Sequence, residues 1–92
     1  MAHLEVELVA ADRKIWSGGA TVVSAPAADG EVGIMPGHTP LLAVLRAGEI
    51  RVTPFEGEPF SGTVTGGFLS VDANRVTIVA DSVTMNPGSP TR

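Results

Sequence analysis

The sequence predicts an all-β domain that folds as a β sandwich or flattened barrel. Short segments in which apolar and polar residues alternate recur along the chain, which is the pattern of half-buried strands. Glycine, proline and charged turn residues interrupt these segments every eight to twelve residues, a spacing typical of sandwiches and barrels. No window places apolar residues at the spacing of an amphipathic helix. We therefore expect no helix in this domain and no C-terminal helical domain in this sequence.

The N-terminal segment predicts two strands separated by a charged turn. Apolar side chains occupy every second position from residue 4 to residue 10, so one face of this strand is expected to be buried. A charged turn at residues 12–14 follows, and the Ser-Gly-Gly segment at residues 17–19 is expected to break the chain again. The second strand is expected over residues 20–25, which are rich in β-branched side chains, and Pro26 is expected to end it.

The most apolar stretch, residues 30–45 with the sequence GEVGIMPGHTPLLAVL, is also the one most interrupted by glycine and proline. Its two prolines prevent a helix from running through it. The sequence predicts short strands at residues 32–35 and 41–45 on either side of a loop, with His38 at the tip. The apolar side chains of this stretch either plug one end of a small β core or form a contact surface for a partner.

The second half of the chain repeats the pattern of strands and turns. The expected strands cover residues 49–53, 60–65, 68–71 and 76–80, with residues 81–85 as a continuation of the last one. The adjacent glycines at 66–67 indicate a bulge or the close approach of another backbone. Trp16 and Phe68 are expected in the core. Residues 86–92 contain two prolines and a glycine and are expected to be a flexible tail, so the expected folded domain is residues 1–85.

Length and composition limit the class of protein. The chain has 92 residues, enough for one domain, and contains no cysteine that could form a disulfide or a thiolate metal site. A formal charge of −4 argues against a nucleic-acid partner, because phosphate binding needs clustered Lys and Arg. Glu5 and Glu7 interrupt the apolar core of any export signal, and the longest uncharged run is too short to span a bilayer. We expect a soluble monomer when the chain is isolated, without membrane insertion.

No set of residues in this sequence has the spacing of a chemical site. His3 and His38 are the only histidines, and neither has a carboxylate or a second histidine at a ligand-like spacing. No serine lies in a nucleophile elbow, and neither glycine-rich segment opens a helix as a phosphate loop does. The acidic residues mostly occupy turns and outward strand positions, where solvated charges are expected. We therefore predict no catalytic, cofactor-binding or metal-binding residue and no enzymatic activity.

Three segments, in order along the chain, carry a resemblance to a known family. They are LEVELVAADRKIWSG, GEVGIMPGHTPLLAVLRAGEIRV and GGFLSVDANRVTIVADSV. Over about residues 3–84, the chain resembles the N-terminal domain of the epsilon subunit of F-type rotary ATP synthases. The resemblance implies a ten-stranded β sandwich at the foot of the central stalk. It implies binding to the gamma subunit and to the polar loops of the membrane-embedded c ring.

The same resemblance implies a role and a location. The role is coupling of proton transport to ATP synthesis, without catalysis by this subunit. The location is that of a peripheral membrane protein on the cytoplasmic face of the bacterial plasma membrane, or of an equivalent coupling membrane. Family members usually continue into a C-terminal helical hairpin that inhibits ATP hydrolysis and in some cases binds ATP. No such segment occurs in these 92 residues, so we expect coupling without that inhibition.

The resemblance also assigns two sets of contact residues. The set that faces the c ring is Asp29, Gly30 and Glu31, and the set that faces the gamma subunit is Ala10, Ala11, His38 and Leu42. Ordinary structural roles are the alternatives at these positions. Glu31 would then be a solvated turn acid, His38 a loop histidine bonded to its own backbone, and Leu42 a core side chain. Leu41 is expected in the core.

Two other classes of function remain as alternatives. A stand-alone β-sandwich module for a small ligand or a partner protein would need aromatic and polar groups that converge on one face. One Trp and three Phe are few for that. A small hydrolase is the second alternative, and it lacks any recognisable nucleophile in this sequence.

Overall fold

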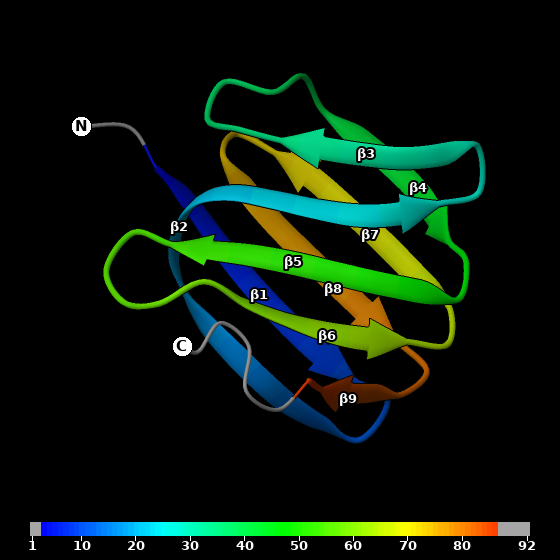
Figure 1. Ribbon diagram of the computed structural model, residues 1–92. Helices are drawn as coiled ribbons and strands as arrows, with labels where there is room; N and C mark the ends of the chain where they lie inside the picture. Colours follow the sequence, from blue (N-terminus) through cyan, green and yellow to red (C-terminus); the bar gives the residue numbers. More distant parts are fainter. Residues whose placement is uncertain (1–2, 87–92) are drawn as a thin grey trace.

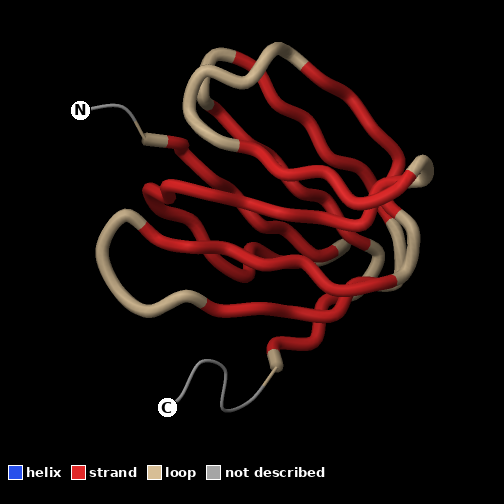
Figure 2. Tube along the Cα trace, turned by 45° about the horizontal axis from the view of Figure 1, so that its top comes forward, coloured by secondary structure: helices blue, strands red, loops and turns tan. Residues whose placement is uncertain are grey.

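The computed structural model describes residues 3–86, and most of these residues lie in β strands (Figure 2). The nine strands are β1 (Leu4–Ala10), β2 (Arg13–Ala27), β3 (Gly30–Ile34), β4 (Leu41–Leu45), β5 (Gly48–Pro54), β6 (Phe60–Val64), β7 (Gly67–Asp72), β8 (Arg75–Ala80) and β9 (Val83–Met85). These described residues contain no helix. The predicted all-β class is confirmed.

The strands form two layers that cross at an angle (Figure 1). The back layer contains β1, β8, β7 and β4 in hydrogen-bonded order, and the front layer contains β3, the second half of β2, β5, β6 and β9. β1 and β8 run parallel to each other. β2 joins the layers, because its first half pairs with β1 and its second half with β5 and β3. The result is one sheet folded over on itself as a flattened barrel.

Alternation along each strand places the core between the two layers. Every second residue of β1, β5 and β8 is buried, as the sequence predicts. The largest fully buried side chains are aliphatic and come from both layers; they include Leu4, Leu8, Ile34, Ile50, Leu69 and Ile78. Trp16 and Leu41 pack against the margin of this core. Burial of aliphatic surface is therefore the main stabilising contribution.

Phe68 does not lie in the core, and the prediction for it is wrong. Its side chain is 54% exposed, whereas its neighbour Leu69 is fully buried. Adjacent residues of a strand point to opposite faces, so the inward position of Leu69 turns Phe68 outward. The alternation of inward and outward positions along the strand, and not the size of the side chain, decides whether a residue points into the core.

β2 continues where the sequence predicts a break. Gly18 and Gly19 lie within it and pair with β1. A Cβ atom at Gly18 would lie 3.0 Å from the Trp16 ring, and one at Gly19 would lie 2.9 Å from the His3 ring. The two glycines therefore make room for neighbouring rings and do not interrupt the strand.

Pro26 also lies within β2, although proline is expected to end this strand. The carbonyl of Pro26 accepts a hydrogen bond from the Arg46 amide at 2.9 Å. The pairing of β2 with β5 ends before this point, at Ser24. In a strand, the N–H and C=O groups of one residue point to the same side. An amide hydrogen at residue 26 would therefore point to the side of Arg46, where β2 no longer pairs with β5, so the proline costs no hydrogen bond with β5.

The strand count differs from the ten that the resemblance implies. β2 is one continuous strand of 15 residues although its halves pair with different neighbours, and this lowers the count. Residues 81–85 do not continue β8 as expected, because β9 turns away and pairs with β6. The Asn86 amide donates to the Ser61 carbonyl at 3.1 Å, which ties the first residue of the expected tail to the sandwich. The rest of that tail, residues 87–92, lies outside the described part.

Gly67 begins β7 where the backbone of β8 lies very close. Its φ is +143°, and a Cβ atom added there would lie 2.7 Å from the Ala80 Cα. The left-handed conformation and the lack of space both require glycine. The predicted close approach of another backbone at the glycine pair is confirmed for Gly67.

Candidate functional site

Exposed apolar side chains lie together on the outer face of the back layer. Val44, Phe68 and Val79 occupy directly paired positions on β4, β7 and β8, and paired residues share a face of the sheet. Leu42 lies two residues before Val44 and points to the same side. We call Leu42, Val44, Phe68 and Val79 the apolar stripe; their exposed fractions are 76%, 55%, 54% and 42%. A contiguous exposed apolar surface of this kind is typical of a binding site.

The apolar stripe is exposed because the inward positions of the same strands are already filled. Leu45, Leu69 and Ile78 are chain neighbours of stripe residues and are almost completely buried. Turning a stripe residue inward would require a one-residue shift of its strand, which would expose the buried neighbour instead. The stripe therefore stays on the surface unless a partner covers it.

The residues that the resemblance assigns to the gamma subunit lie along the back layer, at opposite ends of it. Ala10 ends β1 and Ala11 begins the turn after it, whereas His38 lies in the loop between β3 and β4 (Figure 1). Ala11 is exposed, His38 is half-buried, and Ala10 is only 6% exposed, so the Ala10 side chain faces the core. Leu42 belongs to the apolar stripe, which lies between these two ends.

His38 makes local hydrogen bonds within its loop. Its Nδ1 donates to the carbonyl of Thr39 at 2.7 Å. Its backbone amide donates to the carbonyl of Met35 at 3.1 Å. The first bond matches the structural alternative for His38, a ring bonded to its own backbone, and it holds the ring at the surface beside the exposed Met35 side chain.

The residues assigned to the c ring form the turn between β2 and β3 and the start of β3. Asp29 and Glu31 are exposed, and Gly30 is half-buried with a φ of +135°. The Ala28 amide donates to the Val44 carbonyl at 2.9 Å, which fixes this turn beside the end of β4. The turn thus adjoins one end of the apolar stripe, so the two assigned contact sets lie on neighbouring surfaces and do not form one cluster.

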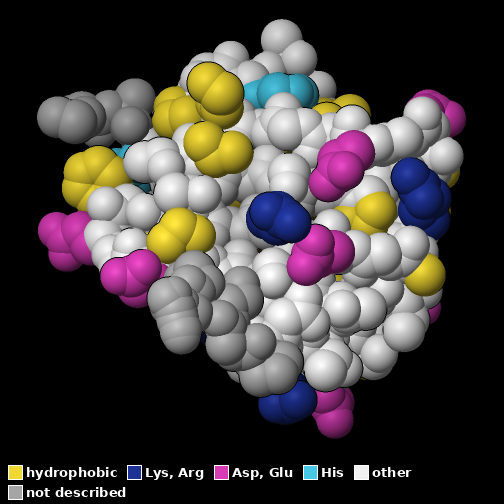
Figure 3. All heavy atoms as spheres, in the orientation of Figure 1, with side chains coloured by type: hydrophobic (Ala, Val, Ile, Leu, Met, Phe, Trp, Pro, Cys, Tyr) yellow, Lys and Arg dark blue, Asp and Glu magenta, His cyan; other side chains and the backbone are white. Residues whose placement is uncertain are grey.

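The outer face of the front layer has a different character. Lys, Arg, Asp and Glu side chains lie next to each other over its middle, and apolar side chains gather toward one end of it (Figure 3). On β5, Arg51 Nη2 forms an ion pair with Glu49 Oε1 at 3.3 Å. Val22 on β2 is 37% exposed and pairs with Thr53. The front face therefore mixes charged and apolar groups, whereas the back face carries a contiguous apolar stripe.

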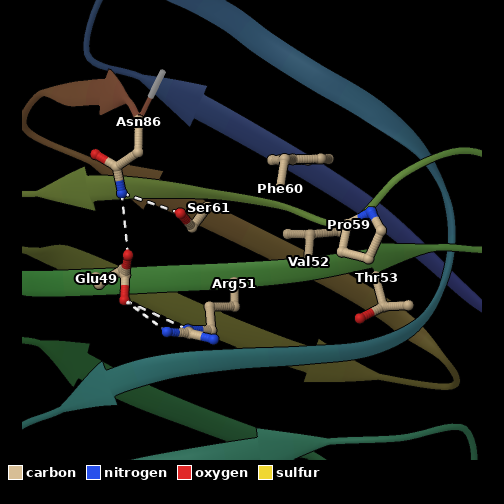
Figure 4. Close-up of a pocket in the computed structure, with 8 residues that line it drawn as sticks. All are labelled: Glu49, Arg51, Val52, Thr53, Pro59, Phe60, Ser61 and Asn86. Carbon is tan, nitrogen blue, oxygen red and sulfur yellow. Dashed lines mark hydrogen bonds and ion pairs between the residues drawn. The ribbon is translucent and has the colours of Figure 1, made fainter. Parts of the chain in front are cut away.

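A hollow of about 590 Å³ lies on the front face over β5 and β6 (Figure 4). Asn86 Nδ2 donates to Glu49 Oε2 at 3.1 Å and to Ser61 Oγ at 3.0 Å. Thr63 Oγ1 donates to Asn86 Oδ1 at 3.2 Å, and Glu49 also pairs with Arg51. These polar groups already satisfy one another. The bonds among Glu49, Ser61 and Asn86 leave these side chains less available to orient a small ligand.

Nothing in residues 3–86 indicates a metal centre, since no group of three or more His, Cys, Asp or Glu side chains could hold an ion there. His3 Nε2 donates to Glu5 Oε2 at 2.8 Å, and the His3 ring packs on Phe55 with 5.1 Å between ring centroids. His3 therefore has a structural role at the start of β1. The same region contains no helix with the length and apolarity needed for a membrane crossing.

Comparison with known sequences decides the family. The profile of the ATP synthase delta/epsilon chain β-sandwich domain matches residues 3–86. The chain belongs to this family. The ATP synthase epsilon chain of Rhodococcus erythropolis is 51% identical over 86 residues, which cover 92% of this chain and 70% of that one. The epsilon chain of Micrococcus luteus is 52% identical over 82 residues, which cover 89% of this chain and 90% of that one.

Solved structures share the fold of this epsilon-type domain. A chain of the Euglena gracilis mitochondrial ATP synthase, OSCP/F1/c-ring, superposes with a TM-score of 0.86 at 22% identity, over 92% of this chain and 54% of that one. A chain of the Tetrahymena thermophila mitochondrial ATP synthase central stalk and c-ring gives a TM-score of 0.72 at 20% identity, over 87% and 64%. The epsilon-type domain spans about half of the Euglena chain. The expected family and sandwich fold are confirmed, and an epsilon chain is a structural and regulatory component of ATP synthase, not a catalytic one.

Sequence reasoning missed most of the apolar stripe. It singled out Leu42 and included Val44 only among the apolar side chains of residues 30–45, whose role it left open between core and contact surface. It treated Phe68 as core and gave no role to Val79. A signal was present, because each of these residues adjoins another apolar residue within its strand. Consecutive residues of a strand point to opposite faces, so two adjacent apolar residues make both faces apolar. The pairing of β4 with β7 and of β7 with β8 was needed to place them in one row.

Proposed function

We propose that this domain links the gamma subunit to the c ring of an ATP synthase and so couples proton transport to ATP synthesis. It does this without catalysis of its own, as a peripheral component on the cytoplasmic face of the coupling membrane. Family membership supports the assembly. The observation that carries the proposal is the apolar stripe on the outer face of the back layer.

The apolar stripe suits a protein partner better than a small ligand. Its side chains lie on an open sheet surface, in register across three neighbouring strands. Full burial of a Val, Leu or Phe side chain contributes about 1.5–3 kcal/mol, and the stripe residues retain roughly half of their surface for that purpose. Several such side chains together supply the apolar centre of a stable interface. We assign this surface, with Ala11 and His38 at its two ends, to the gamma subunit.

The turn at Asp29, Gly30 and Glu31 suits the second partner. Its two carboxylates are exposed at the end of the barrel, beside the end of β4. A short polar turn of this kind fits the polar loops of a c ring. The two contact surfaces adjoin each other, so one rigid sandwich can hold both partners at once and transmit rotation between them.

The test is a double substitution, His38→Asp with Leu42→Asp, followed by measurement of affinity for the purified gamma subunit. Leu42 is exposed and His38 is half-buried in a loop, and neither belongs to the core, so the fold should persist by far-ultraviolet circular dichroism. Charges placed in a desolvated contact cost several kcal/mol. We expect affinity for the gamma subunit to fall by about 100-fold or more.

The control is Val22→Asp, which puts one such carboxylate at an exposed apolar position of the front layer. Affinity for the gamma subunit should stay close to that of the unsubstituted chain. Undiminished binding by a folded double variant would show that the gamma contact lies elsewhere. Equal losses for the double variant and for Val22→Asp would show a general effect of charge.

A further inference from the structure

The loop between β3 and β4 is held by two hydrogen bonds of different origin. Within the loop, the His38 amide donates to the Met35 carbonyl at 3.1 Å. Gly37 has a φ of +90°, so these residues form a type II turn with Pro36 and Gly37 at the positions such a turn favours. From outside the loop, Asn74 Oδ1 accepts a hydrogen bond from the Gly37 amide at 2.8 Å.

Asn74 lies in the two-residue turn between β7 and β8. Both turn residues have positive φ, +52° for Ala73 and +65° for Asn74, as in a type I′ hairpin turn. Glycine suits the second position of such a turn at least as well as asparagine. The backbone therefore gives no reason to prefer Asn74, whereas its side chain has a specific acceptor role toward Gly37.

The turn is also fixed to the rest of the back layer. The Asn74 carbonyl accepts a hydrogen bond from the Glu5 amide of β1 at 2.8 Å. β7 and β8, which the turn connects, carry Phe68 and Val79 of the apolar stripe. Asn74 thus connects the His38 loop to the same rigid strands that present the stripe.

We propose that Asn74 is a positioning residue for the gamma contact. Its side-chain carbonyl holds Gly37, and so sets the orientation in which His38 and Met35 meet the partner alongside the apolar stripe. The inference rests on the proposed function. A loop already fixed in its binding conformation loses less conformational entropy on association, so the hydrogen bond strengthens binding although Asn74 itself need not touch the partner.

The test compares two glycine substitutions in the same turn of the full chain. Asn74→Gly suits the turn and removes the acceptor, whereas Ala73→Gly suits the turn and keeps the acceptor. Hydrogen exchange of the Gly37 amide reports on the bond, and affinity for the purified gamma subunit reports on its consequence. For Asn74→Gly we expect about tenfold faster Gly37 exchange and about fivefold to tenfold weaker binding. Ala73→Gly should match the unsubstituted chain in both measurements.

Asn74→Asp provides a rescue, because it retains an acceptor oxygen and tolerates positive φ. It should restore slow Gly37 exchange and normal affinity. A purely structural role for Asn74 would change the unfolding temperature of Asn74→Gly and leave the affinity of the folded protein unchanged, and that result would overturn the proposal. Unchanged Gly37 exchange in Asn74→Gly would overturn it as well.

The failure of this inference and the failure of the proposed function give different results. If the His38→Asp, Leu42→Asp double variant binds the gamma subunit normally, the proposed contact is wrong and the positioning role falls with it. If that double variant loses binding while Asn74→Gly retains it, only the positioning role of Asn74 is wrong.

Discussion

The two outer faces of this sandwich differ more than the two inner ones. Both layers bury aliphatic side chains of similar size. Outside, the back layer exposes the apolar stripe, whereas the front layer carries the Glu49–Arg51 ion pair and the Asn86 side chain, which bonds to both β5 and β6. The inward residues of each strand specify the fold, so the outward residues are free to specify partners. On the front face they hold the sheet together, and on the back face we assign them to binding.

The substitution with the largest expected effect disrupts the back layer that carries the apolar stripe. Gly67→Ala places a Cβ atom 2.7 Å from the Ala80 Cα at a φ of +143°. β7 and β8 would have to separate there, and the pairing that aligns Phe68 with Val79 would be lost. We expect the free energy of unfolding to fall by about 3 kcal/mol or more, measured by urea denaturation.

Gly33→Ala is the matched control for that substitution. Gly33 also lies in a strand, but an added Cβ atom would meet nothing within 4 Å. Its stability should stay within about 0.5 kcal/mol of the unsubstituted chain. Equal stability of Gly67→Ala and Gly33→Ala would contradict the close approach of β7 and β8.

An intermediate effect is expected from a change confined to the front face. Asn86→Ala removes the side-chain hydrogen bonds to Glu49, Ser61 and Thr63. We expect a loss of about 1–2 kcal/mol in the free energy of unfolding and an unchanged affinity for the gamma subunit. Asn86→Asp should be at least as destabilising at neutral pH, because its carboxylate would lie beside that of Glu49. Weaker gamma binding by Asn86→Ala would show that the front face takes part in the contact.

The smallest effect on stability is expected from a change confined to the back face. Phe68→Thr keeps a strand-forming side chain and removes an exposed aromatic ring, so only cross-strand contacts with Val44 and Val79 are lost. The free energy of unfolding should change by less than about 1 kcal/mol. Affinity for the gamma subunit should fall by about tenfold, as measured by calorimetry. Normal affinity of this variant would remove Phe68 from the contact surface.

Much of the fold could be predicted from the sequence because alternation is a local property. The inward positions of β1, β5 and β8 were correct for that reason. The errors at the glycines arose where the packing of a side chain over the backbone decides the outcome. Gly18 makes room for the ring of Trp16 in the same segment, and Gly19 makes room for the ring of His3 at the start of the chain. The sequence does not show where these rings pack, so such glycines cannot be distinguished from a break.

The site was less predictable than the fold, because it depends on which strands become neighbours. Leu42 and His38 came from a resemblance to a family, and the structure adds that His38 lies at the end of the layer that carries Leu42. Val44, Phe68 and Val79 are far apart in sequence and form one row only after β4, β7 and β8 have paired. The bond from Gly37 to Asn74 spans 37 positions and has no sequence signature.

The parallel pairing of β1 with β8 has a consequence for the chain during its synthesis. At about 5–20 residues per second, β1 pairs with β2 early, but its other edge stays uncovered for several seconds until Arg75–Ala80 are made. An uncovered strand edge can pair with other nascent chains. Glu5 and Glu7 lie on that strand, and Glu7 forms an ion pair with Lys14 of β2 at 3.0 Å. Glu5 therefore carries the negative charge that can oppose edge-to-edge aggregation. We therefore expect Glu5 to reduce aggregation of the incomplete chain before β8 is made.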